Sequence, residues 1–158
     1  MGKSTIVATN NFDQLGMSIP LFFSGSNASR SFLELMGNDR PKTQLLFPVF
    51  ASHIWRDLPD NNPQKKPNRE FYELYKNVHK SDIGEPFFTG VGADCLTLIV
   101  DAIKAVGTDP VKMRQYLENL SFVGTSSMYK FSKDNHLGSD MSSVFVGVAQ
   151  GNDFKLAR

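Results

Sequence analysis

The sequence predicts an α/β fold, in which short apolar strands alternate with helices along one chain. Runs such as residues 45–50 and 144–148 are continuously apolar, as expected of strands inside a sheet. Between such runs, apolar residues recur at i, i+3, i+4 and i+7, the spacing of one helix face. Glycine and proline mark most of the boundaries. These patterns favour a parallel sheet flanked by helices over an all-helical or an all-β domain.

The N-terminal part of the chain predicts helices and strands in alternation. Gly16 follows the first helix, at the position where a left-handed residue commonly ends one. Pro48 interrupts an apolar strand, which indicates a sheet edge or an irregularity at that point. In order, the expected elements are a helix over 5–15, a strand over 19–23, a helix over 29–36, a strand over 45–50 and a proline-rich linker over 56–67.

The rest of the chain predicts longer helices followed by strands. The longest helix, over 92–106, carries an apolar stripe and is expected to be mostly buried. Asp109 and Pro110 predict the start of the next helix, which runs to about Asn119. The stripe of the long helix consists of Leu96, Ile99, Val100 and Ile103. An earlier amphipathic helix is predicted from the spacing of Phe71, Leu74, Tyr75 and Val78. Strands are expected over 128–131, 144–148 and 154–156.

A small polar turn is the best candidate for a ligand site. Ser24, Gly25, Ser26 and Asn27 join the end of an apolar strand to a helix, and ligands of open α/β sheets bind near such loops. A helix start offers unpaired N–H groups and a partial positive charge, which favour a carboxylate. Glycine permits close approach, and serine hydroxyls donate hydrogen bonds. Plain capping of the helix by Ser26 or Asn27 explains the same residues without a ligand.

Composition argues against several classes of function. The formal net charge is +1 and no basic run exceeds Lys65-Lys66, so we expect no nucleic-acid partner. The three histidines lack metal-ligand spacing, and the single cysteine offers no cluster, so we expect no metal and no cofactor. Cys95 is expected to be a buried structural thiol. No segment of signal-peptide type and no stretch approaching the roughly 20 apolar residues of a membrane span is expected.

Several segments, taken in their order and spacing, carry a resemblance to one family. They are Ile19–Ser24, Leu58–Gln64, Phe71–Tyr75, Ala93–Leu96, Val100–Lys104, Thr108–Pro110, Phe122–Thr125, Asp134–Gly138 and Gly151–Leu156. On these segments the chain resembles the C-terminal portion of the periplasmic solute-binding proteins of branched-chain amino acid ABC transporters, the type I periplasmic binding proteins. Ala93 departs from the family's tyrosine, Gly25 and Ser26 replace the histidine and glycine of a related subset, and Asn135 is an extra residue in a turn.

The resemblance implies a partial fold with two lobes. Residues 1–55 would form part of the C-terminal lobe, 56–67 the hinge or linker, 68–143 part of the N-terminal lobe, and 144–158 the final strands, which return to the C-terminal lobe. Both lobes would lack their opening βα units, which leaves strand edges and apolar faces open. We therefore expect the chain to associate with itself, to swap elements, or to be part of a longer protein.

The resemblance also implies a function. The chain would be the substrate-binding component of an ABC transporter, or a fragment of one, and not an enzyme. It would bind a small amino acid or an aromatic or other organic acid between the lobes, with a membrane permease as its further partner and the periplasm as its location. Ser24, Gly25, Ser26 and Asn27 would contribute from one lobe, and Thr89 and Gly90, just before the long helix, from the other. A ligand-sensing regulatory domain of the same fold and an enzyme with unrelated site chemistry remain alternatives.

Overall fold

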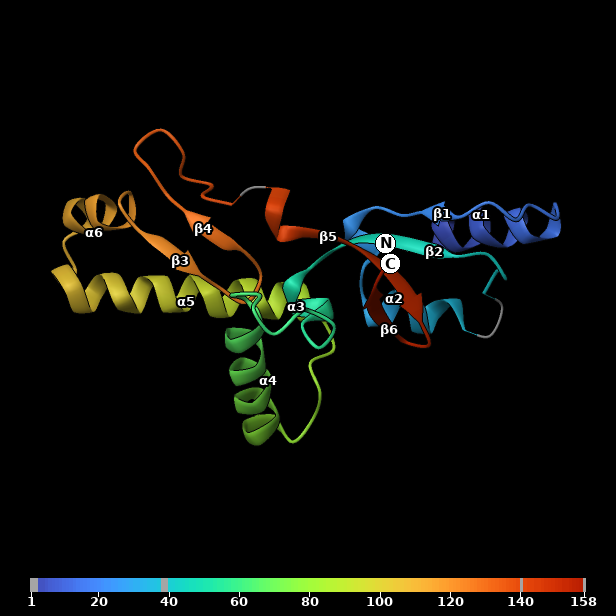
Figure 1. Cartoon of the computed structure of the whole chain (residues 1–158), viewed down its shortest axis with the longest axis horizontal. Helices are drawn as coiled ribbons and strands as arrows, with labels where there is room; N and C mark the ends of the chain where they lie inside the picture. Colours follow the sequence, from blue (N-terminus) through green and yellow to red (C-terminus); the bar gives the residue numbers. More distant parts are fainter. Residues whose placement is uncertain (1–2, 38–39, 140, 158) are drawn as a thin grey trace.

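The computed structural model describes residues 3–37, 40–139 and 141–157, and it shows an elongated molecule with a group of elements at each end (Figure 1). One group holds a sheet and two helices. The other holds the two longest of the described helices and a small hairpin, and α3 (Ala51–Ile54) and the start of β5 lie where the groups meet. The chain therefore has mixed α/β architecture, as the sequence predicts.

The first group is built on one four-stranded sheet in the order β1-β2-β5-β6. β1 pairs with β2 in parallel, whereas β2–β5 and β5–β6 are antiparallel. The parallel sheet expected from the sequence is thus a mixed sheet with one parallel pair. Its elements are α1 (Lys3–Gln14), β1 (Leu21–Phe22), η1 (Gly25–Asn27), α2 (Arg30–Met36), β2 (Leu45–Phe50), β5 (Val144–Gln150) and β6 (Asp153–Leu156).

The core of this group lies against β2, whose residues alternate between buried and half-buried. Phe47 is fully buried, and its ring stacks on Phe23 with centroids 4.8 Å apart. Phe154 meets the same ring edge-on at 5.1 Å. Leu33 of α2 is also fully buried in this cluster. Aromatic burial of this kind fixes β2 at the centre of the sheet.

Pro48 lies inside β2 without disrupting the sheet, because its missing N–H faces a side where no strand lies. β1 pairs only with Leu45 and Leu46, so the edge of β2 beyond Leu46 is open. Phe23 N donates to the Leu46 carbonyl on that side, and two residues further along the strand the Pro48 backbone points the same way. The sheet edge that Pro48 predicts is therefore present, but only along the part of β2 beyond Leu46.

The second group is dominated by α5, which runs from Pro86 to Val106 and not from Gly92. Pro86 occupies the first turn of α5, where its lack of a backbone N–H costs nothing. The other elements are α4 (Lys65–His79), α6 (Pro110–Leu117), β3 (Ser121–Val123), β4 (Met128–Lys130) and η2 (Met141–Ser143).

Two predictions of burial in this group, those for the apolar stripe of α5 and for Cys95, are wrong. The α5 stripe of Leu96, Ile99, Val100 and Ile103 is exposed, and so are Leu74 and Val78 of α4. Cys95 is exposed as well. On α4, Asn68 and Tyr72 are the buried residues. Helical spacing identifies the face that needs an apolar partner, but it does not say whether the same chain supplies that partner.

α5 also has the length and apolar composition of a membrane-crossing helix, contrary to the expectation from the sequence. These two properties are weak support for a membrane span, because core helices of globular proteins share them. Asp94 is buried near the middle of α5 and accepts hydrogen bonds from Thr125 and Ser126. This network indicates a helix that packs against protein on that side.

Candidate functional site

The predicted ligand turn leaves the sheet directly after β1. Ser24 is extended, and Gly25, Ser26 and Asn27 then form a single 3-10 turn closed by Asn27 N donating to the Ser24 carbonyl at 3.0 Å. The hydroxyl of Ser24 lies 2.7 Å from that of Ser26 and donates to Asn27 Oδ1 at 2.9 Å. The turn is therefore a self-supporting unit whose side chains are already oriented.

The turn does not cap the helix that follows. The N-cap of α2 is Ser29, whose hydroxyl accepts from Phe32 N at 3.1 Å. Capping by Ser26 or Asn27, the alternative explanation from the sequence, is therefore wrong. Asn27 Oδ1 is occupied by Ser24, while Asn27 Nδ2 has no hydrogen-bond partner among the described residues. A free amide nitrogen is a donor available to a carboxylate or a carbonyl.

Two open cavities flank the turn. Asn27 lines both of them, Ser24 lines the first and Ser26 lines the second. The first measures about 320 Å³ and lies between β1 and α1, where Thr9 and Phe12 complete it. The second measures about 340 Å³ and extends along α2 past Ser29, Ser31, Phe32 and Leu35. Both have the size at which small-ligand sites begin.

Thr89 and Gly90 lie within α5, in its first turns. The Thr89 hydroxyl donates to the Glu85 carbonyl of its own helix at 2.8 Å. Gly90 is buried, its carbonyl accepts from Thr125 Oγ1 at 3.0 Å, and a Cβ there would lie 3.4 Å from that of Ser52. Gly90 therefore allows α5 and α3 to pack closely. Neither residue lines the two cavities beside Asn27.

The start of α5 nevertheless contacts the segment that follows the ligand turn. Ser31 Oγ donates to Glu85 Oε1 at 2.6 Å, and Arg30 Nη1 donates to the Ile83 carbonyl at 2.8 Å. The rings of Phe50 and Phe87 stack with centroids 4.6 Å apart. These contacts join the two groups of elements. The sequence reasoning missed them, because nothing in the sequence pairs α2 with the residues before α5.

His53 is buried where β2 meets α3. Its Nδ1 accepts from Phe50 N at 3.2 Å, which leaves Nε2 to donate to the Ala28 carbonyl at 2.9 Å. Burial lowers the pKa of His53 below its usual value of 6.5, although those hydrogen bonds and the charges of Asp153 and Glu85 oppose the shift. The neutral ring thus ties α3 to the residue that follows Asn27.

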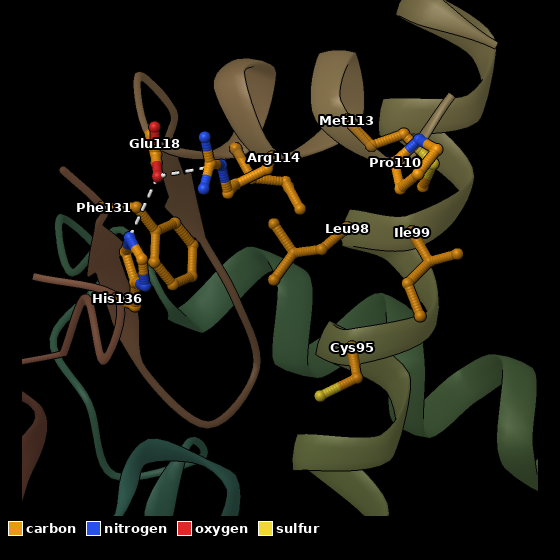
Figure 2. Close-up of a pocket in the computed structure, with 10 residues that line it drawn as sticks. Cys95, Leu98, Ile99, Pro110, Met113, Arg114, Glu118, Phe131 and His136 are labelled. Carbon is orange, nitrogen blue, oxygen red and sulfur yellow. Dashed lines mark hydrogen bonds and ion pairs between the residues drawn. The ribbon is translucent and has the colours of Figure 1, made fainter. Parts of the chain in front are cut away.

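A larger cavity, of about 530 Å³, lies between α5, α6 and the segment after β4 (Figure 2). Its walls are mainly apolar, from residues such as Leu98, Met113 and Phe131. At one end Glu118 Oε1 lies 3.1 Å from His136 Nε2 and 3.5 Å from Arg114 Nε, as Figure 2 shows. Because these polar groups already pair with one another, this cavity is a weaker candidate for binding a carboxylate than the turn at Asn27.

Metal chemistry has no support in the part of the chain that the structure describes. No group of three or more His, Cys, Asp and Glu side chains there could hold a metal ion. His136 pairs with Glu118, and His53 is occupied by backbone groups. What the turn and its cavities offer is hydrogen bonding from an amide and hydroxyls beside aromatic and aliphatic walls, which is the chemistry of binding.

No family model matches the sequence, and no curated protein matches it. The fold, in contrast, is shared with part of several solved structures, and it corresponds to a portion of the type I periplasmic-binding-protein fold. An extracellular ligand-binding receptor from Rhodopseudomonas palustris HaA2 has a TM-score of 0.80 and 21% identity over 99% of this chain and 45% of that chain.

Two further structures agree with this assignment of the fold. A type 1 periplasmic binding protein from Bordetella pertussis Tohama I has a TM-score of 0.71 and 21% identity over 99% of this chain and 44% of that one. A leucine-binding protein from Thermotoga maritima MSB8 has a TM-score of 0.71 and 19% identity, over 98% and 41% respectively. The chain thus spans less than half the length of the proteins it resembles, which is consistent with the predicted C-terminal portion.

Proposed function

We propose that the chain is the ligand-binding component of an ABC transporter, or a portion of one, and that it binds a small amino acid or another organic acid. The observation that carries the proposal is Asn27, whose free amide nitrogen lies in a pre-oriented turn between two cavities. The fold supports the same proposal, because proteins that share it include extracellular ligand-binding receptors and a leucine-binding protein.

The turn has the donors that a carboxylate ligand needs. Asn27 Nδ2 would donate to a carboxylate oxygen, because the Ser24 hydroxyl already holds the amide oxygen of the same side chain. Ser24 and Ser26 would add hydroxyls, and Gly25 would let the ligand approach the backbone. Phe12 and Phe23 provide apolar walls for the rest of the ligand. Pre-orientation lowers the entropy that binding costs.

Thr89 and Gly90 would contribute to the proposed site from the start of α5. The Ser31–Glu85 hydrogen bond holds that end of α5 next to α2. A ligand that contacts both groups of elements would favour the arrangement in which they lie closest, since a ligand shifts the population toward the state it binds best. Such a change is what a membrane permease would recognise, and a periplasmic location follows from that partner.

Self-association is a further part of the proposal. The chain exposes apolar side chains on α4 and α5, and exposed apolar surface favours contact with another protein surface.

A thermal-shift screen over amino acids and aromatic acids tests the ligand proposal. A compound at 100 times its Kd stabilises the folded state by about 2.7 kcal/mol, which is readily detected. Asn27→Asp replaces the donor nitrogen by an oxygen that repels a carboxylate, so we expect it to weaken binding at least about tenfold. Asn77→Asp, on the exposed surface of α4, makes the same change of charge away from the turn and is the matched control. The proposal fails if no compound shifts the wild type, or if the two variants bind equally.

A further inference from the structure

The cavity that extends along α2, here called the α2 cavity, has both polar and apolar lining residues. None of them carries a charge, and they are Ser26, Asn27, Ser29, Ser31, Phe32 and Leu35. The Ser29 and Ser31 hydroxyls lie 3.1 Å apart and continue the polar lining that begins at Asn27. Phe32 and Leu35 supply the apolar lining. The α2 cavity can therefore hold the polar groups of a small ligand and contact its apolar side chain.

A carboxylate lies one hydrogen bond beyond this lining. Ser31 Oγ donates to Glu85 Oε1 at 2.6 Å, so the carboxylate of Glu85 is close to the cavity although Glu85 is not itself a lining residue. Glu85 is half-buried, and it forms no ion pair with any residue that the structure describes. Arg30, the cation next to Ser31 in the sequence, donates instead to the Ile83 carbonyl and to Asp153. The negative charge of Glu85 is therefore available to a ligand.

The backbone on both sides of Glu85 sets the position of this carboxylate. Ile83 and Pro86 are buried, which holds the chain in place just before α5. Glu85 is the N-cap residue of α5, but its side chain makes no capping hydrogen bond to that helix. The carboxylate reaches α2 instead, where it accepts from Ser31. Glu85 is thus not needed to satisfy the N–H groups at the start of its own helix.

We propose that Glu85 is a specificity-determining residue of the proposed binding site, and that its carboxylate pairs with an ammonium group of the ligand. This inference rests on the proposed function. A zwitterionic amino acid places its carboxylate at Asn27 Nδ2 and its ammonium group toward Ser31 and Glu85. An acid without the amino group brings no cation to Glu85, and its own charge is repelled there. Because Ser31 lines only the α2 cavity, that cavity holds the ligand, and not the one between β1 and α1.

Two pairs of compounds that differ only in the amino group test this role. They are leucine with 4-methylpentanoate, and phenylalanine with 3-phenylpropanoate, each titrated calorimetrically at neutral pH. In at least one pair, the wild type should bind the amino acid about tenfold more tightly than its partner, as expected for hydrogen bonds to a charged group. Glu85→Gln keeps an acceptor for Ser31 but removes the charge, so it should reduce this preference to less than about threefold.

Glu34→Gln is the matched control, because Glu34 is exposed on α2 and does not line the α2 cavity. It should keep the preference of the wild type. Equal binding of both members of each pair, or an unchanged preference in Glu85→Gln, overturns the role of Glu85 while ligand binding at Asn27 stands. An equal loss of preference in Glu34→Gln also overturns it, since the effect then comes from net charge alone. If the wild type binds none of the four compounds, the role of Glu85 is overturned as well. Should Glu85→Gln fail to fold, the comparison within each pair on the wild type still decides.

Discussion

Asp94 on α5 accepts two hydrogen bonds from Thr125, one from the backbone N–H at 2.7 Å and one from the hydroxyl at 2.9 Å. Its other carboxylate oxygen accepts from the backbone N–H of Ser126 at 2.9 Å and from the Ser126 hydroxyl. The Tyr129 hydroxyl adds a longer contact at 3.3 Å. Asp94 therefore fixes the loop between β3 and β4 onto the middle of α5.

Asp94→Asn should destabilise the protein by roughly 3 kcal/mol, because one acceptor becomes an N–H₂ group facing donors and hydrogen bonds to a charged group are lost. Urea unfolding followed by circular dichroism measures this change. Asp101→Asn on the same helix should change the free energy of unfolding by less than about 0.5 kcal/mol. Equal effects of the two substitutions would contradict the role assigned to Asp94.

Gly124 should not tolerate a side chain. A Cβ there would lie 2.5 Å from Asp94 Oδ2, well inside van der Waals contact, and that carboxylate cannot move without breaking its hydrogen bonds. We expect Gly124→Ala to cost about 1–3 kcal/mol, as overpacking commonly does. Gly84→Ala is the control, since no atom lies within 4 Å of its added Cβ. Similar midpoints of urea unfolding for the two variants would show that the loop can shift freely.

His53 should make stability depend on pH. Burial is the main cause that holds its folded-state pKa below 6.5, so the unfolded chain binds more protons between the two pKa values. The contribution of neutral, buried His53 to the free energy of unfolding is therefore complete above pH 6.5. It decreases as the pH falls through 6.5 toward the pKa of the folded state.

The measurement for His53 is the free energy of unfolding at several values between pH 7.5 and 5.5. The wild type should lose stability over this range, and His53→Gln should lose less, although it starts from a lower value because the Ala28 contact changes. An identical pH slope for the wild type and the variant would exclude His53 as the titrating group.

The sequence was informative wherever the deciding interactions are local. Gly16 and Pro110 mark helix boundaries through backbone geometry alone, and the structure places the end of α1 and the start of α6 next to them. The continuously apolar run at 45–50 predicted β2, and the small polar residues at 24–27 predicted a turn after a strand, which in the structure lies between two cavities. The roles of those turn residues in binding remain predictions.

A different set of features was beyond the sequence. Asp94 was visible as one of two acids within an apolar helix, and Thr125, Ser126 and Ser127 as a polar run, but only the fold brings them together. The start of α5 was predicted too late, at Gly92, whereas the helix begins at Pro86. Gly90 therefore lies inside the helix, where it packs closely against Ser52.

By itself, the sequence determined the α/β class, the order of the main elements and the faces of the helices that are apolar, since each depends on spacing within one segment. The tertiary structure alone decided that Cys95, Leu96 and Ile99 face water, that Asp94 holds the loop after β3, and that Ser31 meets Glu85. The physical reason is that burial requires a partner surface distant in sequence. Apolar spacing within a helix shows which face would be buried by a partner surface, but it does not show whether that surface is present.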